Sequence, residues 1–234
     1  MPSGMDPQAT RQQLERLIHP AVVGYALRCA LRVWGRMPQE LRSRGILDQN
    51  RYHIKTILSA LRITWDYVNG IATDADDLRR AEEDTRATCQ SLNELTTLKL
   101  QKANGIHLPP DKVLQKVPLS QEAQDGLKAL LAAVRAASYA AQSPAQYGDH
   151  GVASLALDAQ TWSIAAETKA RAAAERDLEH FAAEWSITPP KEKDDMPVLP
   201  KSDKPMLLED WPLYAHSIPR WFKDAMSNGW VFPF

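Results

Sequence analysis

The chain has 234 residues, and its 28 Lys and Arg side chains are balanced by 29 Asp and Glu, which gives a net charge of −1. This balance provides no overall attraction to nucleic acid or to acidic membranes. The length allows a sizeable core without metal ions or disulfides. One helical domain with an appendage is the simplest organisation, and two small domains are the alternative.

Targeting and redox signals are sparse. Cys29 and Cys89 are the two cysteines; they lack CxxC spacing and fall within helical patterns. We expect them to be buried thiols in a reducing compartment. Residues 1–13 are polar, with no signal-peptide core, and no run reaches roughly 18 apolar residues, the length of a membrane span. The sequence therefore predicts a soluble, cytoplasmic protein with a flexible N-terminal arm over residues 1–19.

Apolar residues recur at three- and four-residue steps along most of the chain, and strand patterns are nearly absent. The predicted helices cover, approximately and in chain order, 20–37, 48–70, 73–102, 120–142 and 152–185. Gly35 and Pro38 end or bend the first helix, and Ser120 caps the fourth. The sequence therefore predicts an all-α fold, an antiparallel bundle of about five long helices within residues 20–187.

The same periodicity selects core positions. The residues predicted to be core are Leu61, Trp65, Leu130, Val134, Trp162 and Phe181. Replacing either Trp65 or Trp162 with Ala should cost about 3–5 kcal/mol if the ring is fully buried.

The end of the chain differs in composition from the helices. A linker rich in Pro and charged residues, 188–205, leads to a C-terminal segment, 206–234, that holds three of the seven Trp. Disordered segments carry few aromatics, so we expect this segment to be held by a surface. The surface can be a groove of the chain's own bundle or another molecule. The candidate partner-binding residues are Trp211, Trp221, Phe222, Trp230 and Phe232.

Arg28, Arg32 and Arg36 follow one another at four-residue steps, so one helical face would carry all three. Arg51, Lys55 and Arg62 could form a similar face on the next predicted helix. Such stripes can contact phosphates. The favoured alternative for Arg28, Arg32 and Arg36 is pairing with the acidic third helix, because the charge is balanced overall and no aromatics are interleaved. That helix supplies Asp74, Asp76, Asp77, Glu82, Glu83 and Asp84.

No pattern indicates catalysis. The six histidines are scattered, with no HExxH and no pair at a four-residue step. Adjacent carboxylates such as Glu82 and Glu83 point to different sides of a helix, and the chain has no GxSxG, GxGxxG or P-loop. We therefore predict no catalytic, cofactor-binding or metal-binding residues, and expect a protein that is not an enzyme.

The stretch from Tyr25 to Trp34 resembles the opening helix of all-α proteins in bacterial conflict systems. Similar features are the Ala-rich helices around residues 138–141, Trp211-Pro212, and the stretch Pro219–Phe222. That class includes immunity proteins of polymorphic toxins and accessory modules beside antiphage effectors. The resemblance implies a binding role and no catalytic residues.

Two functions follow as expectations. The first is a protein-binding subunit or regulator that acts as part of a complex, as an accessory or immunity component of a bacterial defence or toxin system. The second is a small subunit of a ribonucleoprotein that contacts nucleic acid through Arg28, Arg32 and Arg36. A steep salt dependence of nucleic-acid binding would favour the second.

Overall fold

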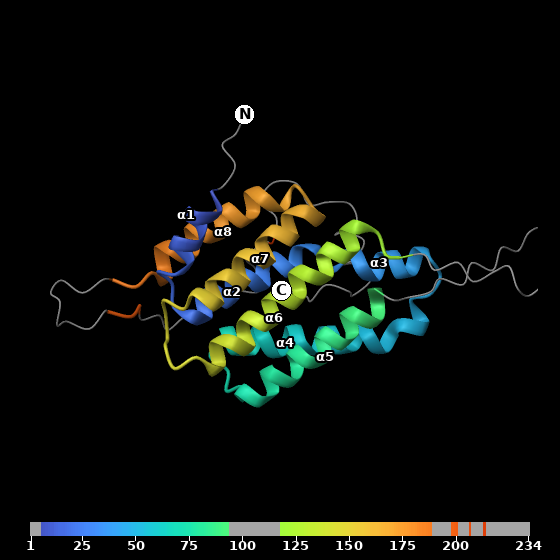
Figure 1. The fold of residues 1–234 in the computed structure, drawn as a ribbon, viewed down its shortest axis with the longest axis horizontal. Helices are drawn as coiled ribbons and strands as arrows, with labels where there is room; N and C mark the ends of the chain where they lie inside the picture. Colours follow the sequence, from blue (N-terminus) through green and yellow to red (C-terminus); the bar gives the residue numbers. More distant parts are fainter. Residues whose placement is uncertain (1–5, 94–117, 189–197, 201–205, 207–212, 214–234) are drawn as a thin grey trace, which may run out of the picture.

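The computed structural model describes residues 6–93, 118–188, 198–200, 206 and 213. Its helices are α1 (Pro7–Leu14), α2 (His19–Trp34), α3 (Arg36–Ser43), the 3-10 turn η1 (Asp48–Asn50), α4 (Arg51–Val68), α5 (Ala75–Asn93), α6 (Gln121–Gln142), α7 (His150–Ala166) and α8 (Ala170–Trp185). In these residues, the β-structure consists of isolated bridges. The predicted all-α fold is confirmed (Figure 1).

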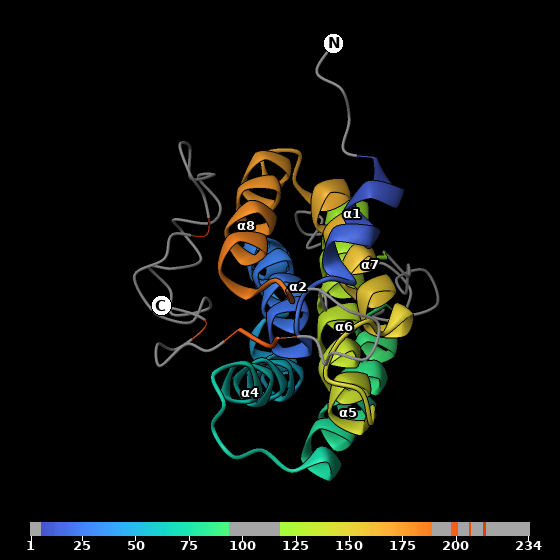
Figure 2. The ribbon, with the colours of Figure 1, turned by 90° about the vertical axis from the view of Figure 1, so that its left-hand side faces the viewer.

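The centre of the bundle is α2. Every residue of this helix except Pro20 is buried, because α4, α6, α7 and α8 all pack against it. Figure 2 shows α2 with α8 on one side, α6 and α7 on the other, and α4 below. A helix covered all round must be apolar all round, and the sequence of α2 meets this requirement at all but a few positions.

Two hairpins flank the central helix. The turn Ser143–Asp149 joins α6 and α7, which form the most extensive helix pair among the described elements, and a short turn near Gly70 joins α4 to α5. Close approach depends on small residues. A Cβ atom at Gly126 of α6 would lie 3.2 Å from the Val33 carbonyl oxygen of α2, so any larger residue would force the two helices apart.

The predicted flexible arm is wrong for residues 6–19. Asp6 accepts a hydrogen bond from the Gln8 amide and caps α1, and Pro7 occupies its first turn. This helix packs against α7, and Leu14 and Leu17 are fully buried. The pair Asp6-Pro7 is a helix-start signal that the polar composition of this stretch concealed.

The predicted fifth helix, 152–185, is also wrong as one element. It is two helices, and the chain is extended at Glu167, where φ is −152° and ψ is 106°. The Glu167 carboxylate accepts hydrogen bonds from Arg36 Nη2 at 2.7 Å and from the Lys169 amide at 3.2 Å. Tertiary contacts thus end the helix where the local sequence offers no Gly or Pro.

The predicted core is largely confirmed. Leu61, Leu130, Val134 and Phe181 are at most 1% exposed and Trp65 is 9% exposed. Trp162 is only partly buried, and Lys128 Nζ lies 4.1 Å from the centroid of its ring.

Some predictions lie outside the described residues. They concern residues 94–117, most of the linker, and the aromatic residues from Trp211 to Phe232.

Candidate functional site

A buried cluster of charged side chains joins α2 to α8. Arg28 of α2 donates from Nε to Asp177 Oδ2 at 2.7 Å and from Nη2 to Oδ1 at 3.3 Å. Arg32, one turn further along, also donates to Asp177. Their exposed fractions are 2%, 0% and 0% for Arg28, Arg32 and Asp177. We call these three residues the Arg–Asp cluster.

In the described part of the chain, both guanidinium groups of the cluster bind the Asp177 carboxylate. Burial lowers the pKa of Arg28, although Asp177 opposes this effect. Burial is also the largest effect on Arg32 and lowers its pKa, but Asp177, Cys29 and Tyr25 together outweigh burial, so the pKa of Arg32 is raised. Cys29 lies beside them, and burial raises the pKa of its thiol to about 11, so the thiol stays neutral near pH 7. Backbone dipoles also stabilise a buried guanidinium group.

Two backbone carbonyl groups supply such dipoles to Arg32. Its Nη2 donates to the Ala173 oxygen at 3.3 Å, and its Nε donates to the Leu213 oxygen at 2.7 Å. Leu213 lies 28 residues beyond the end of α8, so this bond attaches the C-terminal part of the chain to the centre of the bundle. Met206 is 7% exposed and belongs to the same hydrophobic core.

The arginines do pair with acids, but the predicted partners are wrong. Arg28 and Arg32 bind Asp177, and Arg36, which lies in α3, binds Glu167. The acidic residues of α5 pair instead with arginines of α5 and α6: Asp76 and Glu83 with Arg79, Asp77 with Arg80, and Glu82 with Arg86 and Arg135.

The predicted phosphate contacts required Arg28 and Arg32 to be exposed, and the structure places both inside the bundle. On α4, Arg51 binds Asp48 at 2.8 Å and Arg62 binds Asp66 at 3.1 Å, both at the surface. The signal for burial was in the sequence: α2 is apolar on every side. Arginines in such a helix need a buried carboxylate, which Asp177 provides within an otherwise Ala-rich helix.

A pocket of about 400 Å³ lies at one end of the bundle. Its walls come from Ile18–Pro20 at the start of α2, Tyr67 of α4, residues 140–146 around the end of α6, and Leu199-Pro200. Most of these side chains are aliphatic. We call it the end pocket, and sequence reasoning missed it because four distant segments form it.

One wall of the end pocket carries a buried histidine. His19 is 3% exposed, and its Nε2 atom has no hydrogen-bond partner among the described residues. Burial lowers the pKa of His19, while Asp149 and a hydrogen bond with the Ala140 backbone oppose that shift. The imidazole is therefore kept neutral near pH 7 and retains an unused polar atom beside an apolar space.

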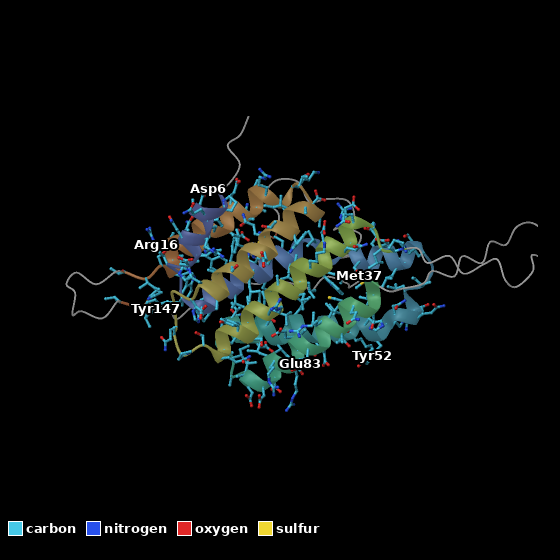
Figure 3. All side chains as sticks on the ribbon, in the orientation of Figure 1. Asp6, Arg16, Met37, Tyr52, Glu83 and Tyr147 are labelled. Carbon is cyan, nitrogen blue, oxygen red and sulfur yellow. The ribbon has the colours of Figure 1, made fainter. Side chains whose placement is uncertain are left out.

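Three of the five exposed large apolar side chains in the described residues belong to segments that form this pocket. Tyr139, Tyr147 and Val198 are 51%, 37% and 64% exposed, and each is next in sequence to a residue that lines the pocket. Tyr52, which is 75% exposed, lies at the opposite end of the molecule from Tyr147 (Figure 3). Tyrosine is enriched where proteins bind one another, so the pocket has the composition of a docking surface.

A second groove, of about 570 Å³, lies between α1 and α7. His150 Nδ1 is 2.6 Å from Glu15 Oε1, and Arg11 donates to Ser154 at 3.0 Å. Both contacts link α1 to α7 near the surface, and they explain how the short first helix is fixed. His150 is 80% exposed, which leaves it in water rather than in an enclosed site.

In the part of the chain that the structure describes, no group of three or more His, Cys, Asp or Glu is arranged to hold a metal ion. Within the same residues, no helix has both the length and the apolar character needed to cross a bilayer. Comparison of the chain with family models, with curated proteins and with solved structures finds no match.

Proposed function

We propose that the protein is a non-enzymatic, protein-binding subunit that docks on its partner through the end pocket. The observation that carries this proposal is an apolar pocket of about 400 Å³ whose lining residues Ala140, Gln146 and Leu199 are next in sequence to the exposed Tyr139, Tyr147 and Val198. Aromatic rings around a pocket that excludes water are typical of the residues that dominate binding energy.

The pocket chemistry defines the partner segment that fits. Its aliphatic walls suit an aliphatic or aromatic side chain. The Nε2 atom of His19 in one wall is buried, so the inserted group should be apolar throughout. The aromatic residues Trp211, Trp221, Phe222, Trp230 and Phe232 remain proposed as further anchors for the partner.

Within this class, the resemblance of the Tyr25–Trp34 stretch to conflict-system proteins supports an accessory or immunity component of a bacterial defence or toxin system. We propose a cytoplasmic location, which suits two reduced, buried thiols. The role of the bundle is then steric, because a rigid helical body held on a partner can block or position it.

The test uses surface variants that leave the core intact. Tagged wild-type protein is used to capture partners from its native host, and a captured protein is then purified and titrated. Tyr139→Ser combined with Val198→Ser should weaken its affinity at least tenfold, about 1.4 kcal/mol. Tyr52→Ser, at the opposite end, is the matched control. Equal affinities for all three proteins would contradict the proposal, and a steep salt dependence with RNA or DNA would favour the nucleic-acid alternative.

A further inference from the structure

The strongest observation outside the end pocket is the attachment of the C-terminal part of the chain to the Arg–Asp cluster. We propose that the bundle carries a recognition site for this chain's own segment around Met206 and Leu213, which it holds by the bond from Arg32 of α2 to the Leu213 carbonyl and by burial of the Met206 side chain. The site is distinct from the end pocket: Arg32 lies 13 residues beyond His19 on α2, about 20 Å along the helix axis.

Arg32 gives the site its polar specificity. The guanidinium group is 0% exposed and, like that of Arg28, binds the buried Asp177 carboxylate. A buried charge needs strong acceptors. The Nε bond to Leu213, at 2.7 Å, is shorter than the bond to Ala173, at 3.3 Å. The carbonyl of an incoming chain is thus one of the groups that make burial of Arg32 tolerable.

Apolar burial supplies the second contact. Met206 is 7% exposed within the main core, and the Leu213 side chain packs partly buried against the same core. By contrast, Val198, which also follows α8, is 64% exposed. Among the described residues that follow α8, Met206 and Leu213 therefore pack on the bundle, whereas Val198 is largely exposed.

These contacts identify the occupant by its chemistry. The site accepts a segment with two apolar side chains seven residues apart and a backbone carbonyl placed for Arg32. The chain itself offers such a segment at Met206 and Leu213, and the structure places both residues on their own bundle. The same segment from a second copy, or from another protein, is the alternative that the experiment must distinguish.

The experiment separates the two parts of the full chain without unfolding it. A recognition site for a specific protease is inserted between Ser202 and Asp203, the folded protein is cut, and the products are run on a native sizing column. We expect the fragment beginning at Asp203 to stay with the bundle at micromolar concentration, with the mass of one intact chain. Met206→Ser and Leu213→Ser should each weaken retention at least fivefold, whereas the control Val198→Ser should not.

Arg32→Lys tests the polar contact, because lysine keeps the charge but lacks the Nε donor. Since this buried change can also disturb the bundle, the Met206 and Leu213 variants provide the independent test. Three results would overturn the proposal: release of the wild-type fragment on cutting, retention of both serine variants equal to that of the wild type, or an uncut chain that is a dimer exchanging its C-terminal ends. None of them bears on the affinity that Tyr139 and Val198 confer at the end pocket.

Discussion

At the scale of single residues, Asp177 has the most consequential position. It is fully buried and is the carboxylate that binds both Arg28 and Arg32. Asp177→Asn keeps the shape but removes the charge, so two buried guanidinium groups lose a carboxylate that both of them bind. We expect the free energy of unfolding to fall by about 3–5 kcal/mol. Denaturant titration measures this loss, and the exposed Asp158→Asn provides the control, which should change stability by less than about 0.5 kcal/mol.

His19 provides a residue-scale prediction about pH. Burial holds its pKa in the folded protein below the usual value of 6.5. Above pH 6.5, His19 is neutral in both the folded and the unfolded chain. Its ionisation then contributes nothing to the free energy of unfolding. As the pH falls below 6.5 the unfolded chain binds the proton first, so stability decreases.

We therefore expect His19→Asn to reduce the slope of unfolding free energy against pH below 6.5, compared with the wild type. The exposed His180→Asn is made and measured in parallel as the matched histidine substitution. Parallel slopes for the wild type and His19→Asn would show that His19 is protonated equally easily in both states.

At the scale of elements, the sequence predicted most helices because apolar periodicity and end signals agree along α2, α4, α5 and α6. Ser120 caps α6 as predicted, by accepting a hydrogen bond from the Ala123 amide. The break after α7 could not be predicted, because its cause is Arg36, more than a hundred residues away in the chain. The end pocket was missed for the same reason: distant segments form it, and no local pattern marks their meeting.

The apolar periodicity predicts that Trp65 and Trp162 are both core residues, but their different burial predicts different losses of stability on replacement by Ala. Trp65 of α4 is 9% exposed in the main core, whereas Trp162 of α7 is partly exposed, with Lys128 over its ring. Trp65→Ala should lower the free energy of unfolding by about 3–5 kcal/mol. Trp162→Ala should cost less, about 1–2 kcal/mol, because less apolar area returns to water. Thermal and denaturant unfolding of the two variants gives the comparison, and equal losses would contradict the different burial.

At the scale of the whole molecule, the C-terminal part of the chain contributes to the bundle as well as following it. Met206 adds a buried side chain to the core, and Leu213 completes the hydrogen bonding of Arg32. The sequence indicated that this segment needs a surface but left open whether that surface is its own bundle or another molecule. For Met206 and Leu213 the surface is the chain's own bundle.

Removal of residues 206–234 should therefore lower the stability of the bundle as well as any partner affinity that the aromatic residues supply. Loss of the buried Met206 side chain and of a hydrogen bond to the charged Arg32 should together cost at least about 2 kcal/mol. The full-length double variant Met206→Ser, Leu213→Ser is the matched comparison, because it weakens the same attachment but keeps every aromatic residue. Melting temperature and partner affinity are measured for both proteins. A truncated chain with the melting temperature of the wild type would show that the attachment adds no stability. A double variant with a lower melting temperature than the wild type but the same partner affinity would show that attachment and partner binding are separate properties of the segment.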